Sequence, residues 1–333
     1  MPLSRKTPES PHVNHVSSRL PHSFLGWLWR ICLAAIALLV LGTGLAILNN
    51  NFSTSRRSRA EFVNSLDRSL AASTDWTMDQ YTWEKGRGVW ASYEGRMFAS
   101  NSALAHMLVD CAATSGNSRL QHLAVEFAAA HRANPVTWAK MVDPTIATHP
   151  LSDSESAELV EYQRWLLYGI SPSEAPLSTA DMENMFSPDK FRTGKATHQL
   201  LALYLYRRFN GDNPTLQRVM NHVEERIAAE AALDFRVTDL YLQRIAFLLA
   251  AGRPDLVKPR WAERALAAQQ SDGGWYYNWH GWAPTPYRYS ISDEHSIAHA
   301  TAQGMWVACM LRYRYPEWID KNLPIKVSYS DLV

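Results

Sequence analysis

The chain has 333 residues, of which 47% are hydrophobic and 20% are charged. This balance is typical of an ordered protein with one large domain or two ordinary ones, and it excludes disorder throughout the chain. The formal net charge is only +1, and the arginines are spread along the chain instead of forming a basic block. The composition therefore argues against nucleic acid as a partner.

The amino-terminal tail is expected to be disordered. Residues 1–22 contain prolines among scattered serines and histidines and show no apolar periodicity. Such a segment cannot bury enough apolar surface to offset the entropy of ordering.

A long apolar stretch follows the tail. Residues 31–48 carry no charge, and residues 24–29 extend the stretch past the roughly twenty residues that a helix needs to cross a bilayer, with Arg30 as the single interruption. We expect residues 23–48 to be one uncleaved transmembrane helix that attaches the protein to a membrane. A cleaved signal peptide is the alternative, and the long tail disfavours it.

Positive charges on the two sides of this stretch are nearly balanced, so they favour neither orientation of the helix in the membrane strongly. The basic residues concerned are Arg5, Lys6, Arg19, Arg30, Arg56, Arg57 and Arg59. We expect a cytoplasmic amino terminus and an extracytoplasmic domain.

Residues 49–97 are expected to link this helix to the main domain. Phe62, Leu66 and Leu70 fit one face of a short helix. The stretch from Asp75 to Arg96, which is rich in Trp and Tyr, is expected to be a long loop.

From residue 98 to residue 333 the pattern predicts an all-α domain. Apolar residues recur at i, i+3 and i+4 in eight segments, and no segment has a convincing strand pattern. The expected helices are 98–114, 118–131, 153–168, 193–209, 215–230, 236–251, 255–270 and 293–314.

These segments form repeated helical hairpins. Gly211 and Gly252 each follow a helix and precede a proline that opens the next one, at a period of about forty residues. Segment 200–206 is apolar nearly all round, whereas its partner carries polar groups at Glu224 to Arg226. Because the first kind of helix is buried and the second is not, the pattern predicts an inner and an outer ring. We expect an α/α toroid, which four or five hairpins could leave incomplete or open.

One turn supports the same architecture. Segment 261–275 ends a helix in two glutamines, turns on two glycines and closes with Trp275, and we expect Gly273 or Gly274 to take a positive φ. It resembles the Gln-Trp repeat of the squalene cyclase and protein prenyltransferase superfamily, with Gln269 or Gln270, Gly274 and Trp275 at the matching positions. The resemblance implies an α/α toroid. The chain lacks the Asp-x-Asp-Asp acid motif of the cyclases and the Asp-x-Cys of the prenyltransferases, so these activities are not implied.

Polar residues at the starts of inner helices are the candidates for chemistry, because in such a ring they face the central cavity. His295, His299 and Gln303 are spaced by four and share one helix face, with Asp293 expected as the cap. The residues expected to be catalytic are Asp293, Glu294, His295, His299 and Asp239.

Three interpretations of this group stay open. Two imidazoles at i and i+4 with a carboxylate can bind zinc, but the Glu that follows the first His in metalloprotease helices is missing. A metal-free acid/base site is the second interpretation. In the third, these groups only satisfy helix starts and hydrogen-bond across the ring. The metal and any cofactor are therefore left unknown.

The segment from Trp275 to Tyr289 is unusually aromatic, and it is expected to pack because aromatic rings gain much from burial. It could cap the ring or line a pocket for a sugar chain, an isoprenoid or a cation. The residues expected to bind substrate are His198, Gln243, Gln303, Trp279, Trp282, Tyr287 and Tyr289.

The sequence favours a membrane-anchored toroid enzyme, or an enzyme-like protein, that acts on an isoprenoid-linked or carbohydrate substrate. Toroid glycoside hydrolases and polysaccharide lyases place carboxylates, histidines and tyrosines at the same rim, which suits an extracytoplasmic domain. The alternative is a non-catalytic scaffold that binds a protein partner in an envelope complex.

Overall fold

The structure analysed is a computed structural model. The described residues are 22–55, 57–85, 95–133, 135–188, 195–234, 236–276, 279–281, 288–290 and 296–324. The chain forms two compact units, Met1–Leu45 and Ala46–Val333. The tail expected at residues 1–22 lies outside the described residues, apart from its last residue.

Helix α1 (His22–Asn50) contains the apolar stretch. Within it, residues Gly26–Asn50 are long and apolar enough to cross a membrane, with a mean hydropathy of 2.7, and no second such helix occurs among the described residues. The large apolar side chains from Trp27 to Leu41 are exposed. One apolar helix at the expected position is therefore confirmed, and by its length and composition it could cross a membrane.

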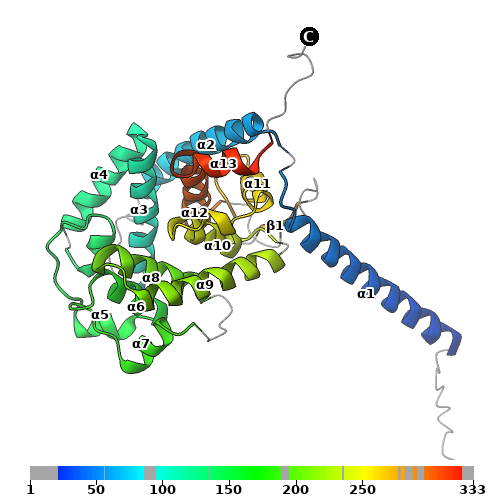
Figure 1. Cartoon of the computed structure of the whole chain (residues 1–333), viewed down its shortest axis with the longest axis horizontal. Coiled ribbons are helices and arrows are strands. Elements are labelled where there is room, and N and C mark those ends of the chain that lie inside the picture. Colours follow the sequence, from blue (N-terminus) through cyan, green and yellow to red (C-terminus); the bar gives the residue numbers. More distant parts are fainter. Residues whose placement is uncertain are drawn as a thin grey trace, which may run out of the picture. The chain divides into compact units, whose positions relative to one another are not determined.

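The second unit is helical, as the periodicity predicted (Figure 1). Its α-helices in the described residues are α2 (Arg59–Lys85), α3 (Gly95–Ser115), α4 (Ser118–Ala133), α5 (Asp153–Glu158), α6 (Glu161–Ile170), α7 (Thr179–Met185), α8 (Ala196–Asn210), α9 (Pro214–Leu233), α10 (Asp239–Ala250), α11 (Pro259–Ala267), α12 (Ala298–Cys309) and α13 (Pro316–Asn322). The short helical turns are η1 (Thr137–Met141), η2 (Pro254–Leu256) and η3 (Met310–Arg314), the last continuing α12 as a π-helix.

One short β-ribbon interrupts the helical pattern. Strands β1 (Trp279–Gly281) and β2 (Arg288–Ser290) are antiparallel, with His280 opposite Tyr289. The ribbon lies in the segment where the sequence indicated an aromatic loop. Three residues per strand are too few to produce the alternating pattern by which strands are recognised in a sequence.

Helix α2 is longer than the sequence indicated. It runs unbroken to Lys85, whereas a loop was expected from Asp75. The helix continues because Phe62, Leu66 and Leu70 are joined on its buried side by Trp76. This side packs against α12 and α11, so part of the expected linker belongs to the core of the second unit.

Five helices of the second unit form a closed cycle of contacts. Helix α3 packs against α12, α12 against α10, α10 against α8, and α8 against α6, while η1 contacts both α6 and α3. The remaining long helices lie outside this cycle: α4 packs on α3, α9 on α8 and α10, and α2 on α12 (Figure 1). Helices α10 and α12 are buried over almost their whole length, as expected for inner helices.

One outer-helix residue departs from the expected pattern. Glu224 of α9 was placed on a polar outer face, but it is only 1% exposed. Its carboxylate accepts a hydrogen bond from Arg253 at 2.7 Å. Desolvation by burial raises the pKa of Glu224, and the neighbouring Arg253 opposes that shift. Glu224 therefore joins α9 to the turn after α10 instead of facing water.

The turn that resembles a Gln-Trp repeat joins α11 to α12. Trp275 is 1% exposed, and its indole N–H donates to the Ala265 carbonyl of α11 at 2.8 Å. Its ring lies on Gly304 of α12, where an added Cβ would come within 2.6 Å of the ring. Trp275 is thus held between two helices, and only a glycine on α12 leaves room for it.

The glutamine and the glycines shape the same turn. The Gln269 side chain donates to the Gly273 carbonyl at 2.8 Å and to the Ser69 carbonyl of α2 at 2.9 Å. Gly273 has a φ of 94°, so the expectation that one of the two glycines takes a positive φ is confirmed. A Cβ at Gly273 would also lie 2.3 Å from the Ala72 carbonyl oxygen. Glutamine and glycine therefore connect the turn to α2.

Candidate functional site

The five helices of the contact cycle, α3, α6, α8, α10 and α12, are called the inner helices below. They line a cavity of about 50 Å³. Each of these helices contributes side chains to the cavity. Within each helix, lining residues recur at a spacing of three or four, so they lie on one face of the helix. The lining residues are Ala103, Leu104 and Met107 of α3, Tyr162 and Leu166 of α6, His198 and Leu201 of α8, Gln243 and Phe247 of α10, and His299 and Gln303 of α12. The cavity is therefore built by the tertiary arrangement and not by one motif.

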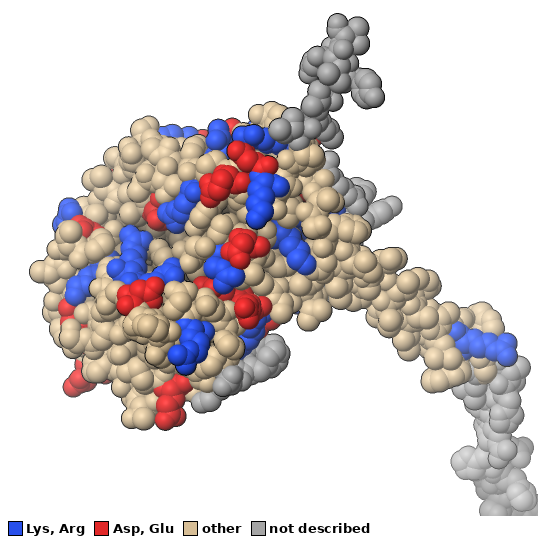
Figure 2. All heavy atoms as spheres, viewed as in Figure 1, with Lys and Arg blue, Asp and Glu red and all other residues tan. Residues whose placement is uncertain are grey.

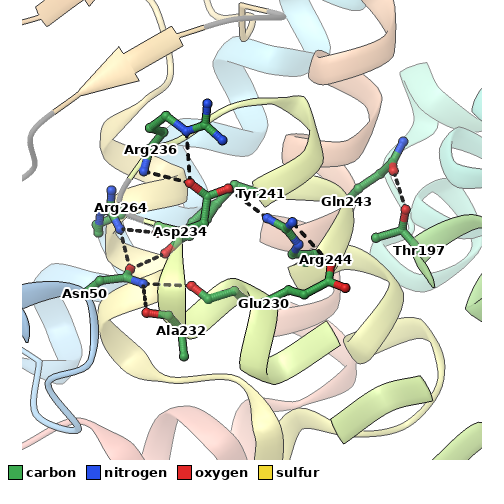
Figure 3. Close-up of polar contacts among 11 residues, drawn as sticks. Asn50, Thr197, Glu230, Ala232, Asp234, Arg236, Tyr241, Gln243, Arg244 and Arg264 are labelled. Atoms are coloured by element: carbon green, nitrogen blue, oxygen red, sulfur yellow. Dashed lines mark hydrogen bonds and ion pairs between the residues drawn. The ribbon is translucent and has the colours of Figure 1, made fainter. Parts of the chain in front are cut away.

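The polar side chains enter the cavity close to helix starts. Tyr162, His198 and His299 each stand in the first turn of their helices, and Gln243 follows one turn into α10. The Thr197 hydroxyl donates to the Gln243 carbonyl oxygen at 2.9 Å, which links α8 to α10 (Figure 3). This bond orients the Gln243 amide. Four of the five inner helices thus present their amino-terminal ends to one region.

His299 and Asp239 form the charged part of the site. The Nδ1 atom of His299 lies 3.6 Å from a carboxylate oxygen of Asp239, slightly beyond hydrogen-bond length. Burial lowers the pKa of His299, so its imidazole is neutral at pH 7. Desolvation by burial raises the pKa of Asp239, although the Leu240 N–H and the nearby Arg244 oppose this shift. A neutral imidazole beside a carboxylate can accept a proton from a bound molecule.

Gln303 supplies a buried polar group beside His299. Its side chain is fully buried, and its Nε2 atom lies 3.3 Å from the nearer ring nitrogen of His299. Its Oε1 atom has no hydrogen-bond partner among the described residues. A buried amide oxygen without a donor costs about 1–3 kcal/mol, and this cost is removed when a ligand or water donates to it.

An aromatic contact forms another part of the cavity lining. The rings of Tyr162 and His198 lie 4.3 Å apart between centroids, with their planes inclined by 43°. Both residues stand at the starts of their helices, α6 and α8. The cavity lining thus includes the imidazole and phenol rings of His198 and Tyr162 and the imidazole and amide groups of His299 and Gln303, with the Asp239 carboxylate behind His299.

The structure brings together five of the residues that the sequence singled out. His198, Gln243, His299 and Gln303 line the cavity, and Asp239 contacts His299. The expected residues Asp293, Glu294, His295, Trp282 and Tyr287 lie outside the described residues. Trp279 and Tyr289 stand on the β-ribbon, where the backbone is described and the side chains are not.

The start of the last inner helix differs from the prediction. Helix α12 has Ile297 as its N-cap, so Asp293 is not its cap and His295 precedes the helix. The Ile297 N–H donates to the Trp275 carbonyl at 2.9 Å, which holds the chain extended at this point. A long-range bond therefore delays the helix that the local pattern placed five residues earlier.

Sequence reasoning missed the contribution of α6. Tyr162 and Leu166 line the cavity, and α6 was expected only as part of one longer helix, 153–168. The chain is extended at Leu159 and Val160, which separates α5 from α6. The i, i+4 spacing of Tyr162 and Leu166 is a signal that could have identified the cavity-facing side.

The interpretation of this site as a metal centre finds no support in the described part of the chain. Within these residues no three His, Cys, Asp or Glu side chains are grouped closely enough to bind a metal ion. His299 and Asp239 alone provide two ligands. Asp293 and His295, on which the metal hypothesis also rested, lie outside the described residues.

A second polar cluster lies where α1 ends (Figure 3). Asn50 is fully buried, and its amide donates to the carbonyls of Ala231 and Ala232 at 2.8 and 3.2 Å. Its carbonyl oxygen accepts from the Tyr241 hydroxyl at 2.9 Å and from the Arg264 guanidinium. These four bonds use the full hydrogen-bonding capacity of an amide side chain. The cluster is therefore structural, and Asn50 belongs to the core.

Comparison of the chain with models of protein families, with curated proteins and with solved structures found no match. No relative is at hand from which a role could be transferred to His299, Asp239 or Gln303. The superfamily resemblance of the Gln-Trp turn therefore stays a prediction, and function is argued from the cavity.

Proposed function

We propose that this protein is a membrane-anchored α/α-toroid enzyme that carries out acid/base chemistry on a carbohydrate, with the cavity of the inner helices as its active site. The single observation that carries the proposal is the convergence of His198, Gln243, His299 and Gln303 from three inner helices on one cavity. The cycle of contacts among α3, α12, α10, α8 and α6, which is closed through η1, supports the toroid architecture. The Gln-Trp turn between α11 and α12 supports it independently.

In this proposal His299 is the general base. Burial favours its neutral imidazole, so the Nε2 atom beside the Gln303 amide can take a proton from a substrate hydroxyl or a water molecule that displaces this amide. The Asp239 carboxylate accepts a hydrogen bond from Nδ1–H of the ring and stabilises the imidazolium that forms. Their separation of 3.6 Å has to shorten by less than 1 Å for a hydrogen bond, which is a normal adjustment when substrate binds.

The chemistry of the lining favours a carbohydrate over an isoprenoid. Glutamine amides, imidazoles and a phenol both donate and accept hydrogen bonds, which matches the hydroxyl groups of a sugar. The volume of about 50 Å³ has room for about four water molecules, which is far less than the 300 Å³ or more of a site that encloses a larger ligand. A polar end group fits this space, whereas an isoprenoid chain would leave the amide of Gln303 unpaired.

We further propose that α1 spans a membrane and that the second unit lies on its extracytoplasmic side. Support comes from the length and hydropathy of Gly26–Asn50 and from the exposure of its apolar side chains. An envelope location also fits a carbohydrate substrate. The scaffold hypothesis, in which this unit binds an envelope protein without catalysis, is the outcome against which the enzyme is tested.

The test uses the full-length protein in lipid nanodiscs and a panel of neutral and uronate-containing oligosaccharides. A ligand present at about 100 times its Kd stabilises the folded state by about 2.7 kcal/mol, which raises Tm by about 5 °C. Products are identified by mass spectrometry. We expect at least one member of the panel to raise Tm and to be converted. If none of them does either, the carbohydrate proposal is wrong.

Two variants then separate the enzyme from the scaffold. We expect His299→Gln to lower kcat by about 10²-fold to 10⁴-fold, the usual effect of removing a general base, with unfolding free energy changed by less than about 1 kcal/mol. Asp239→Asn should lower kcat less, because the imidazole stays in place. His222→Gln, at an exposed position of α9, is the matched control and should leave kcat unchanged. Equal activity of all three variants would contradict the assignment of the base.

The pH profile gives an independent readout. Because burial lowers the pKa of His299, the base is fully available at neutral pH. We expect kcat to be constant above about pH 6.5 and to fall as the pH drops through the lowered pKa of the imidazole. An increase of kcat toward acidic pH would show that the group acts in its protonated form.

A further inference from the structure

The second unit exposes few large apolar side chains, and two of them lie beside the end of α1. Outside α1 the exposed large apolar residues of the described chain are Phe52, Val125, Val160, Leu233 and Tyr313. Phe52 is 47% exposed and Leu233 is 66% exposed. The Asn51 side chain donates to the Ala232 carbonyl at 2.7 Å. Phe52 follows Asn51 in the sequence, and Leu233 follows Ala232. The backbones at Phe52 and Leu233 therefore lie close together.

Basic side chains border this surface. Lys258 donates to the Asn51 side chain at 2.6 Å and stands over the ring of Trp261 at 5.5 Å. Arg236, three residues after Leu233, is paired with Asp234 and keeps half of its side chain exposed. Apolar side chains flanked by cations are the combination that binds the headgroup layer of a lipid bilayer.

The chain itself fixes how far this surface can be from a bilayer. Twenty residues from Gly26 end at Leu45, and about twenty residues cover the hydrocarbon core. Asn50 lies five residues later in the same helix, at about 1.5 Å per residue, so it is at most about 7.5 Å from that boundary. The headgroup layer of one leaflet is roughly 5–7 Å thick. If α1 spans the bilayer as proposed, the length of chain between Leu45 and Asn50 keeps Asn50 within reach of the headgroup layer.

We propose that Phe52 and Leu233, with Lys258 and Arg236 around them, form a lipid-contact surface that inserts into the headgroup layer from which α1 emerges. The hydrogen bonds of Asn50 and Asn51 to the end of α9 fix Leu233 next to Phe52, so a turn after α1 and the end of α9 meet the lipid together. Figure 2 shows basic and acidic groups interspersed over the face drawn. This inference rests on the proposed membrane span of α1 and is independent of the cavity and of its chemistry.

The experiment compares two labelled positions of nearly equal exposure in the full-length protein. Leu233→Cys carries the probe at the proposed surface, and Val125→Cys on α4, 67% exposed, is the matched control. Both variants carry Cys32→Ser, since Cys32 is exposed, whereas Cys111 and Cys309 are buried. Each is labelled with an environment-sensitive fluorophore and reconstituted into phosphatidylcholine vesicles, with or without phosphatidylglycerol.

We expect the label at position 233 to shift its emission to the blue and to be quenched by lipids that carry a nitroxide at headgroup depth. The label at position 125 should keep the spectrum that it has in mild detergent, and phosphatidylglycerol should increase quenching only at position 233. Equal quenching of both labels, or none at 233, overturns the proposal. A blue shift that grows with protein-to-lipid ratio but without lipid quenching indicates self-association and overturns it too. Failure of the protein to float with the vesicles also overturns the proposal.

Discussion

Replacing Trp275 with alanine tests whether the Gln-Trp turn holds the second unit together. The side chain is 1% exposed, it lies on Gly304, and its N–H donates to the Ala265 carbonyl at 2.8 Å. Truncation of a buried large aromatic costs about 3–5 kcal/mol, and the lost hydrogen bond accounts for about 1 kcal/mol of it. Gly304 has no side chain to fill the space, so we expect about 4 kcal/mol.

The assay is equilibrium unfolding of the full-length protein in mild detergent, followed by far-ultraviolet circular dichroism. For a unit of this size, a loss of about 4 kcal/mol lowers Tm by about 8 °C. Trp275→Phe keeps most of the volume and loses the N–H, so about 1–2 kcal/mol is expected. Val125→Ala, at an exposed position, is the control. If Trp275→Ala unfolds like this control, the turn does not pin α11 to α12 and the argument from burial fails.

Two further predictions concern buried polar groups. Asn50→Ala should lower the free energy of unfolding by about 2–4 kcal/mol, because it leaves the Tyr241 hydroxyl and the Arg264 guanidinium without this partner. Chemical unfolding measures this loss, with Asn221→Ala at an exposed position as the control. Equal stability of the two variants would contradict the prediction. Burial, aided by the positive charge of Arg208, lowers the pKa of His106 to about 4. Because the pKa of His106 is lower in the folded state than in the unfolded state, the contribution of its neutral imidazole to the free energy of unfolding is complete above about pH 6.5. This contribution, about 3 kcal/mol, is lost as the pH falls to about 4. His106→Gln should flatten the dependence of unfolding free energy on pH across that window, and parallel curves for the variant and the parent would refute the assignment.

The helices could be predicted from the sequence because their signals are local. Apolar spacing, a proline at a helix start and a glycine after a helix end act within a few residues, and they located α8, α9 and α10 to within a few residues. The positive φ expected for one glycine of the Gln-Trp turn is local as well, and it occurs at Gly273.

Most of the polar residues that line the candidate site could also be predicted from the sequence. His198, Gln243, His299 and Gln303 were chosen because polar residues near the starts of apolar helices have to face a cavity or a partner. Tyr162 escaped this reasoning, since the break between α5 and α6 was not recognised. A pattern along one helix cannot show which other helices face it.

What the sequence determined by itself is the all-helical second unit, the single long apolar helix before it and the turn around Trp275. The tertiary structure decided where α12 begins, because the Ile297 N–H is held by the Trp275 carbonyl. It also decided that Asn50 and Glu224 are buried, because their partners, such as Arg264 and Arg253, come from other parts of the chain. The physical reason is the same in each case. Local propensity contributes tenths of a kcal/mol per residue, whereas a buried hydrogen bond or charge pair with a distant partner contributes more and therefore prevails.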